Sequence, residues 1–145
     1  MPSTPTLKTQ TQVKSASELQ EELTNLALRI AQEGYGIKLD FSTYSIKQVE
    51  LILGDVGRGY KQNHNDKGLH GIALEFAAYI ITTIERTTQK GRWDRNHPVL
   101  GENTFPYYWK DLTIFPYTWC TKRIFEGDAE NIWVKYQSFI VQHEK

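Results

Sequence analysis

The sequence has almost no sulfur and no excess of either charge. Cys120 is the only cysteine among 145 residues, so no internal disulfide can form. Lys and Arg together number 17, as do Asp and Glu, and the formal net charge at pH 7 is zero. Domains that bind nucleic acid or an anionic membrane surface usually carry a basic excess. We therefore expect neither nucleic acid nor a membrane as a partner.

Long hydrophobic runs are missing as well. The longest purely apolar run covers residues 76–81, far short of the roughly 20 residues that a transmembrane helix needs. The segment after the first Met has no apolar stretch of the kind that a secretory signal carries. These absences predict a protein of the cytoplasm.

The patterns of common cofactor and metal sites are absent too. No Walker A pattern, no HExxH pair and no second cysteine occurs, and the four histidines do not stand at helical i, i+4 spacing. We predict no cofactor and no metal.

The apolar residues that are present predict helices in a single domain. Residues 1–14 are rich in Thr and Pro and are predicted to form a flexible tail, which leaves 15–145 as one domain. Apolar residues at helical spacing, with glycines after them, mark three helices, and Asp128 predicts the N-cap of a fourth. The predicted helices are 16–33, 45 to about 57–59, 67–89 and 129–143.

The aromatic residues are concentrated in one stretch. Eight of them lie between Trp93 and Trp119, where Pro98, Pro106 and Pro116 interrupt the chain. Aromatic and β-branched residues broken by Pro and Gly are typical of short strands joined by turns. The predicted strands are 92–95, 104–109, 111–115 and 118–124. The last includes the cysteine, which we expect to be a small core hydrophobe.

This order of elements predicts the α+β class, because helices are followed by strands and then by a closing helix. We expect three N-terminal helices to pack on a small antiparallel, aromatic-rich sheet that a C-terminal helix closes.

Four short motifs stand at corresponding points of this plan. They are LDFSTYS at 39–45 before a helix, KGRW at 90–93, FPYTW at 115–119 and KRIFEG at 122–127 before the last helix. In order and kind they resemble a group of small bacterial domains of unknown function. The resemblance covers residues 37–140 and implies a small α+β domain, with no activity attached.

The aromatic stretch is the first candidate for a functional surface. Tyr and Trp side chains that strands leave exposed are common anchors of protein interfaces. The same rings could instead fill the core or line a ligand groove. We predict a non-catalytic protein-binding module, immunity-type or regulatory, and leave its partner and oligomeric state open. The predicted partner-binding residues are Tyr107, Tyr108, Trp109, Tyr117 and Trp119.

Glu75 carries the alternative prediction, a small hydrolase-like enzyme. It lies in the apolar middle of the third predicted helix, and a carboxylate in apolar surroundings has the raised pKa that acid–base chemistry uses. His70 or His97 would assist it. The same glutamate could equally face solvent, and the sequence favours binding over catalysis without deciding between them.

Overall fold

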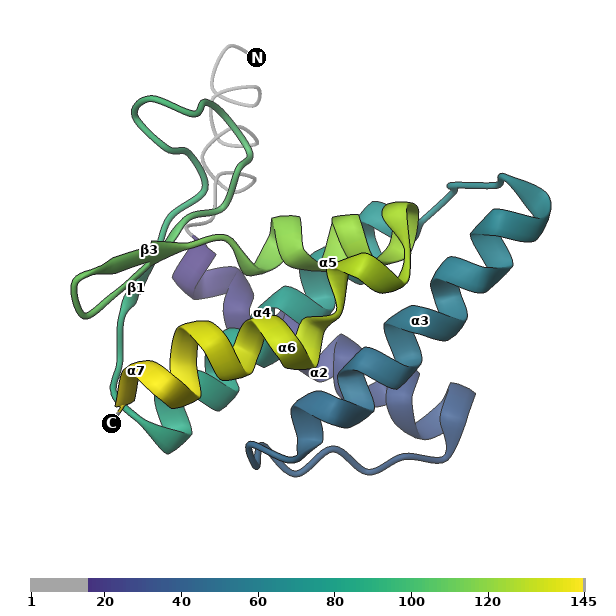
Figure 1. Cartoon of the computed structure of the whole chain (residues 1–145), viewed down its shortest axis with the longest axis horizontal. Coiled ribbons are helices and arrows are strands. Elements are labelled where there is room, and N and C mark those ends of the chain that lie inside the picture. The colour runs from purple at the N-terminus through teal and green to yellow at the C-terminus, as the bar shows by residue number, and fades with distance from the viewer. Residues whose placement is uncertain (1–15, 145) are drawn as a thin grey trace, which may run out of the picture.

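The computed structural model describes residues 16–144, so the tail predicted for 1–14 lies outside the described residues (Figure 1). Most of the described chain is helical. The helices are α2 (Ala16–Tyr35), α3 (Ser45–Asn63), α4 (Leu69–Thr87), α5 (Pro116–Glu126), α6 (Ile132–Tyr136) and α7 (Gln142–Glu144). The strands are β1 (Arg92–Trp93), β2 (Tyr107–Trp109) and β3 (Leu112–Ile114). A 3₁₀ turn, η1 (Asp128–Glu130), precedes α6, and a π-helical turn, η2 (Gln137–Val141), follows it.

Helix α4 is the centre of the fold. It packs against α2 on one side and α5 on another, and α3 in turn packs against α5 and α6 (Figure 1). Its residues Phe76, Tyr79 and Ile80 are fully buried. A helix that is apolar nearly all round is covered on several sides, so the sequence correctly predicted this helix as central.

Helix α3 is longer than predicted. The expected end at Gly57 or Gly59 is wrong, because α3 continues to Asn63. Gly57 lies where α5 crosses: a Cβ there would stand 2.8 Å from the backbone oxygen of Ile124. This glycine therefore allows two helices to approach closely and does not terminate one.

A buried ion pair joins the same two helices. The Nε of Arg123 donates to both carboxylate oxygens of Glu50 at 2.9 Å, and Nη2 lies 2.7 Å from one of them. The side chains of Arg123 and Glu50 are only 7% and 15% exposed. The backbone N–H of Ile132 also donates to Glu50, at 2.8 Å, so this carboxylate fixes both α5 and the start of α6 against α3.

The sheet is small and antiparallel, with strand order β1-β2-β3. Trp93 pairs with Tyr107, and Trp109 pairs with Leu112. The strands predicted at 92–95, 104–109 and 111–115 are therefore present in shorter form.

The strand predicted at 118–124 is wrong, because this segment lies inside α5. Pro116 occupies the first turn of the helix, where its missing N–H costs nothing. Trp119, Cys120, Arg123 and Ile124 then recur at helical spacing and are buried together. Helical packing on α4 thus overrides the β propensity of the aromatic residues.

The last predicted helix is broken into several turns. Asn131, not Asp128, is the N-cap of α6, and its side chain accepts a hydrogen bond from the N–H of Val134 at 3.0 Å. Asp128 instead pairs with Arg123, at 3.1 Å. The segment still closes the fold beside α5, as expected of a C-terminal helix (Figure 1).

The fold belongs to the predicted α+β class, with helices at both ends and a small sheet between them in sequence. Its helices pack mainly on one another. In the part of the chain that the structure describes, no helix has the length and apolar character to cross a bilayer.

Candidate functional site

The structure buries three of the five aromatic side chains predicted to bind a partner. Tyr107 and Trp109 are fully buried and Trp119 is 7% exposed, whereas Tyr108 and Tyr117 are partly exposed. Three of the five rings therefore form part of the core, and Tyr108 and Tyr117 are the two that keep exposed surface.

The alternation of the β2 strand explains this burial. Tyr107 and Trp109 point to the same face, and their polar ends bond to α4. The hydroxyl of Tyr107 donates to Glu85 at 3.0 Å, and the indole N–H of Trp109 donates to Thr88 at 3.0 Å. Tyr108 points the other way, where the Arg92 guanidinium lies 4.5 Å from the ring centroid.

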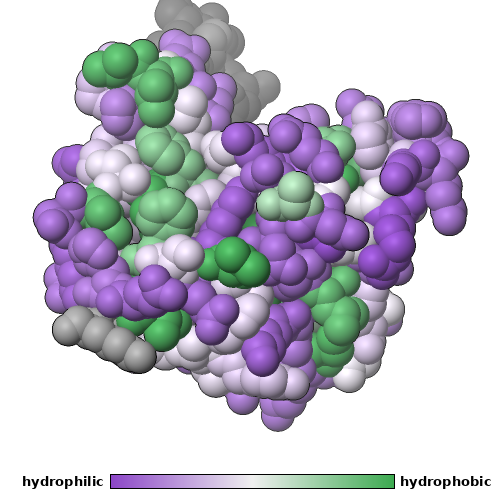
Figure 2. Space-filling view, viewed as in Figure 1, coloured by the Kyte–Doolittle hydropathy of each residue, from purple (hydrophilic) through white to green (hydrophobic). Residues whose placement is uncertain are grey.

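Exposed apolar surface occurs nearby, on the loop between β1 and β2. Residues 94–106, which we call the finger, project from the helical body (Figure 1). Val99 is 85% exposed and Leu100 is 60% exposed at its tip. Figure 2 shows apolar surface on this projecting loop. Two neighbouring exposed aliphatic side chains at the end of a projection form a candidate anchor for a partner.

The finger is held together by internal hydrogen bonds. The N–H of Asp94 donates to Pro106 at its base, and His97 and Gly101 exchange backbone bonds of 2.9 and 3.0 Å at its tip. Nδ1 of His97 accepts the N–H groups of Val99 at 3.1 Å and of Leu100, which fixes the exposed pair. A surface that is ordered before binding loses less conformational entropy on binding.

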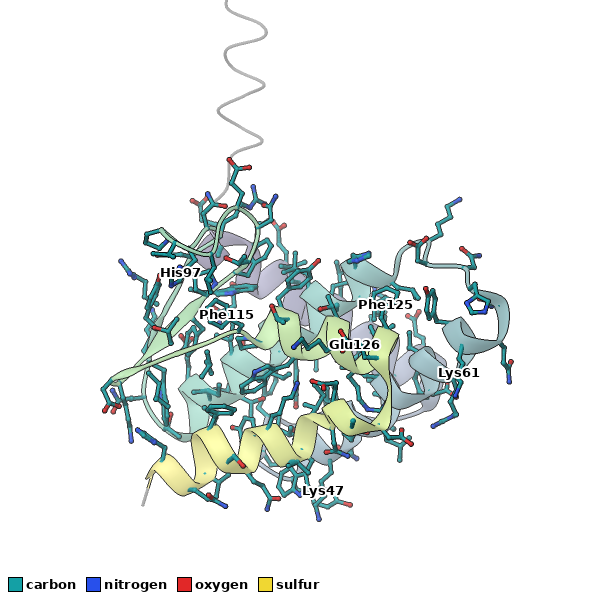
Figure 3. The ribbon with its side chains drawn as sticks, turned by 45° about the horizontal axis from the view of Figure 1, so that its top comes forward. Lys47, Lys61, His97, Phe115, Phe125 and Glu126 are labelled. Atoms are coloured by element: carbon teal, nitrogen blue, oxygen red, sulfur yellow. The ribbon has the colours of Figure 1, made fainter. Side chains whose placement is uncertain are left out.

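An apolar groove of about 440 Å³ begins beside the finger and runs along α5. Leu100 forms one wall, Phe115 and Trp119 come from the start of α5, and Phe139 comes from η2. The rings of Trp119 and Phe139 stack with centroids 5.7 Å apart. Figure 3 shows Phe115 next to His97 of the finger, with ring centroids 5.8 Å apart. Finger tip and groove together make one continuous candidate surface.

The π-helical turn η2 places Phe139 in this groove. Ile132, Tyr136 and Ile140 point into the core at four-residue spacing, while Phe139 stays 42% exposed. π-Helical turns are rare and occur frequently at functional sites. The widened turn supports the assignment of the groove as a working surface.

The rim of the groove carries charged groups. Lys135 pairs with Glu130 at 2.7 Å across one edge. Lys122 lies on the opposite helix, is exposed, and forms no ion pair within residues 16–144. A partner that carries a carboxylate beside its apolar side chains would therefore be matched to this rim.

The residues of the enzymatic alternative do not form a bonded group. Glu75 is half-buried, burial raises the pKa of its carboxyl, and it forms no hydrogen bond or ion pair in the described part of the chain. His70 is exposed beside Phe125, and five residues along α4 place it about 140° around the helix from Glu75. His97 uses Nδ1 to order the finger.

The remaining candidates were the single cysteine and a metal-binding cluster. Cys120 is fully buried, and burial raises the pKa of its thiol, which fits the small core hydrophobe predicted. Over residues 16–144, no group of three or more His, Cys, Asp or Glu side chains is placed to hold a metal ion.

Most residues of the groove were not predicted from the sequence. Val99 and Leu100 form the dipeptide between Pro98 and Gly101, and a short apolar pair bounded by Pro and Gly could have signalled an exposed loop tip. Phe139 precedes the buried Ile140 on the apolar side of the closing helix, and only the tertiary packing shows that it lines a groove beside α5.

A scan against models of known protein families found no match, and searches of curated proteins and of solved structures found none either.

Proposed function

We propose that the protein is a non-catalytic protein-binding module, of the immunity or regulatory type, that docks on a partner through the finger and the adjoining groove. The observation that carries the proposal is the tip of the finger. Val99 and Leu100 expose their side chains to water while His97 holds their backbone. Exposed aliphatic groups on an ordered projection fit insertion into a partner's pocket.

The groove suggests what the partner offers in return. Its walls of Phe115, Trp119 and Phe139 would cover an apolar side chain of the partner, and Lys122 would pair with a carboxylate beside it. We therefore infer a protein partner that presents an apolar residue flanked by Asp or Glu. The enzymatic alternative based on Glu75 has no geometric observation in its favour.

The sequence supports a class of partner and a compartment for this interaction. Zero net charge supports a protein partner over nucleic acid or an anionic membrane. We place this interaction in the bacterial cytoplasm, in line with the resemblance to small bacterial domains noted above and with the single cysteine.

Photo-crosslinking in the source cell tests the proposal. A benzophenone amino acid replaces Val99 in one variant and Leu51 in a control, because Leu51 is 59% exposed on α3, away from the finger. We expect a crosslink to a different protein from position 99 and none to that protein from position 51. A crosslink only to a second copy of the chain, or none from position 99, would overturn the proposal.

A further inference from the structure

A second cavity, also about 440 Å³, lies between α2 and α4 and is lined mainly by polar groups. Helix α2 contributes Gln20 and Glu21, α4 contributes Glu85 and Arg86, and Lys90 follows α4. Helix α2 lies behind α4 in the view of Figure 1, and the finger and its groove contribute no residue to this cavity. The cavity is therefore separate from the proposed docking surface.

Hydrogen bonds order the floor of this cavity. The amide of Gln20 donates to the hydroxyl of Thr82 at 3.0 Å and to Oε1 of Glu85 at 3.1 Å. Tyr107 donates to the other oxygen of Glu85. Each carboxylate oxygen accepts more than one hydrogen bond, so Glu85 retains capacity to accept from a ligand. The carbonyl oxygen of Gln20 is an acceptor as well.

A cation is fixed at the rim by an aromatic stack. The guanidinium of Arg86 lies 3.7 Å from the centroid of the Phe41 ring, and Phe41 stacks on Tyr79 with centroids 4.9 Å apart. Phe41 adopts φ +63°, a left-handed conformation that is costly for an aromatic residue, and its N–H donates to the hydroxyl of Tyr79. Phe41 therefore adopts a strained backbone conformation, and its ring is the one on which Arg86 stacks.

This cation and its neighbour have no anionic partner of their own. Arg86 and Lys90 form no ion pair within residues 16–144, although both line the cavity. On the same walls, Glu85 and Glu21 supply two carboxylates. The lining thus presents two positive and two negative groups around one space, which matches a ligand that carries both charges and is neutral overall.

We propose that this cavity binds a small zwitterion of the α-amino acid class. The ligand's carboxylate would accept hydrogen bonds from Arg86 and Lys90, and its ammonium would donate to Glu85 and the Gln20 carbonyl. The space is a cleft open to solvent, with Glu21, Arg86 and Lys90 exposed at its rim, and its volume is sufficient for a free amino acid with its side chain. The assignment is independent of the docking surface, since the two sites share no residue.

The test titrates the full chain, labelled with ¹⁵N, with each of the twenty standard L-amino acids at pH 7 while backbone amide shifts are recorded. At least one should move the amides of Gln20, Thr82 and Glu85 saturably. That amino acid is then compared with the matched acid lacking the amino group and the matched amine lacking the carboxylate. We expect each analogue to bind at least about tenfold more weakly, because one charge-assisted contact is lost.

Two variants check the assignment of the charges. Arg86→Gln should weaken binding of the amino acid and of the matched acid about tenfold and leave binding of the amine unchanged. Glu85→Gln should weaken binding of the amino acid and of the amine and leave binding of the acid unchanged. Arg29→Gln on the exposed surface of α2 is the control, with binding unchanged. Unaltered thermal unfolding verifies that each variant folds. Failure of all twenty amino acids to shift these amides, or equal binding by Arg86→Gln and Arg29→Gln, would overturn the proposal.

Discussion

The imidazole of His97 holds Leu100 in position, with Nδ1 accepting the backbone N–H of Leu100 at 3.0 Å and that of Val99 at 3.1 Å. One ring therefore determines how the finger presents its exposed aliphatic pair. An unprotonated Nδ1 is required, because a protonated ring nitrogen cannot accept a hydrogen bond.

Replacing this ring should loosen the tip of the finger without unfolding the protein. In His97→Leu, the two N–H groups lose their acceptor but remain open to water, so global stability should fall by less than about 1 kcal/mol. Hydrogen exchange at the amides of Val99 and Leu100 should become several-fold faster. His70→Leu, at an exposed histidine outside the finger, should leave both rates unchanged. Equal exchange rates in the two variants would show that His97 does not order the tip of the finger.

Glycine at position 57 should be required for packing. Gly57→Ala places a Cβ 2.8 Å from the oxygen of Ile124 and 3.3 Å from that of Arg123. The strain should exceed the gain of about 1 kcal/mol that Ala brings to a helix, and we expect a net loss of about 1–2 kcal/mol in urea denaturation. Gly59→Ala in the same helix meets nothing within 4 Å and should stabilise the protein by about 0.5–1 kcal/mol. The same sign for both variants would contradict this packing argument.

The buried ion pair predicts a large loss when one partner is removed. Glu50→Gln leaves the buried guanidinium of Arg123 with only the solvent-exposed Asp128 as a counter-charge, and it weakens the acceptor of the Ile132 N–H. We expect the free energy of unfolding to fall by about 3 kcal/mol. In a double variant, Glu50→Leu with Arg123→Met, part of this stability should return, since no lone charge remains buried. A double variant less stable than Glu50→Gln would show that the pair itself is the main contribution.

Glu75 predicts a pH dependence. Burial raises the pKa of its carboxyl in the folded protein, so the unfolded chain loses this proton first as pH rises. The contribution of protonated Glu75 to the free energy of unfolding is therefore fully present below the ordinary Glu pKa. It is lost as the pH rises through the raised pKa of Glu75 in the folded protein. Glu75→Gln should raise the melting temperature at pH 7. The corresponding gain in the free energy of unfolding should be less than about 1 kcal/mol because the group is half-exposed, and this gain should vanish near pH 3. The exposed Glu33→Gln is the control, and an equal gain there at pH 7 would contradict the desolvation argument.

Regular amphipathic patterns were sufficient to predict the N-terminal helices. In α4, residues 76–81 are apolar and buried all round the helix, and the structure confirms a central helix there. The same approach failed for α5, where Pro116 and Trp119 suggested a strand although their spacing with Ile124 also suits a helix. In short segments, β propensity and helical spacing point different ways, and packing against α4 decides between them.

The proposed docking surface lies partly in the aromatic stretch singled out from the sequence, but of the five residues predicted to bind a partner only Trp119 lines its groove. Aromatic residues between 93 and 119 mark the region of the groove, yet Tyr107 and Trp109 enter the core because β2 alternates. The exposed surface comes from Val99 and Leu100, which composition alone does not distinguish from core residues. Phe139 joins them through three-dimensional packing, from a segment distant in sequence.

The affinity of the crosslinked partner for two leucine variants tests whether the finger is the docking surface. Leu100 and Leu51 are 60% and 59% exposed, so Leu100→Asp and Leu51→Asp make the same chemical change at equal exposure. Measured by titration calorimetry with the purified partner, Leu100→Asp should weaken binding at least about tenfold, and Leu51→Asp should leave it unchanged. Equal affinities of the two variants would show that the finger is not the docking surface.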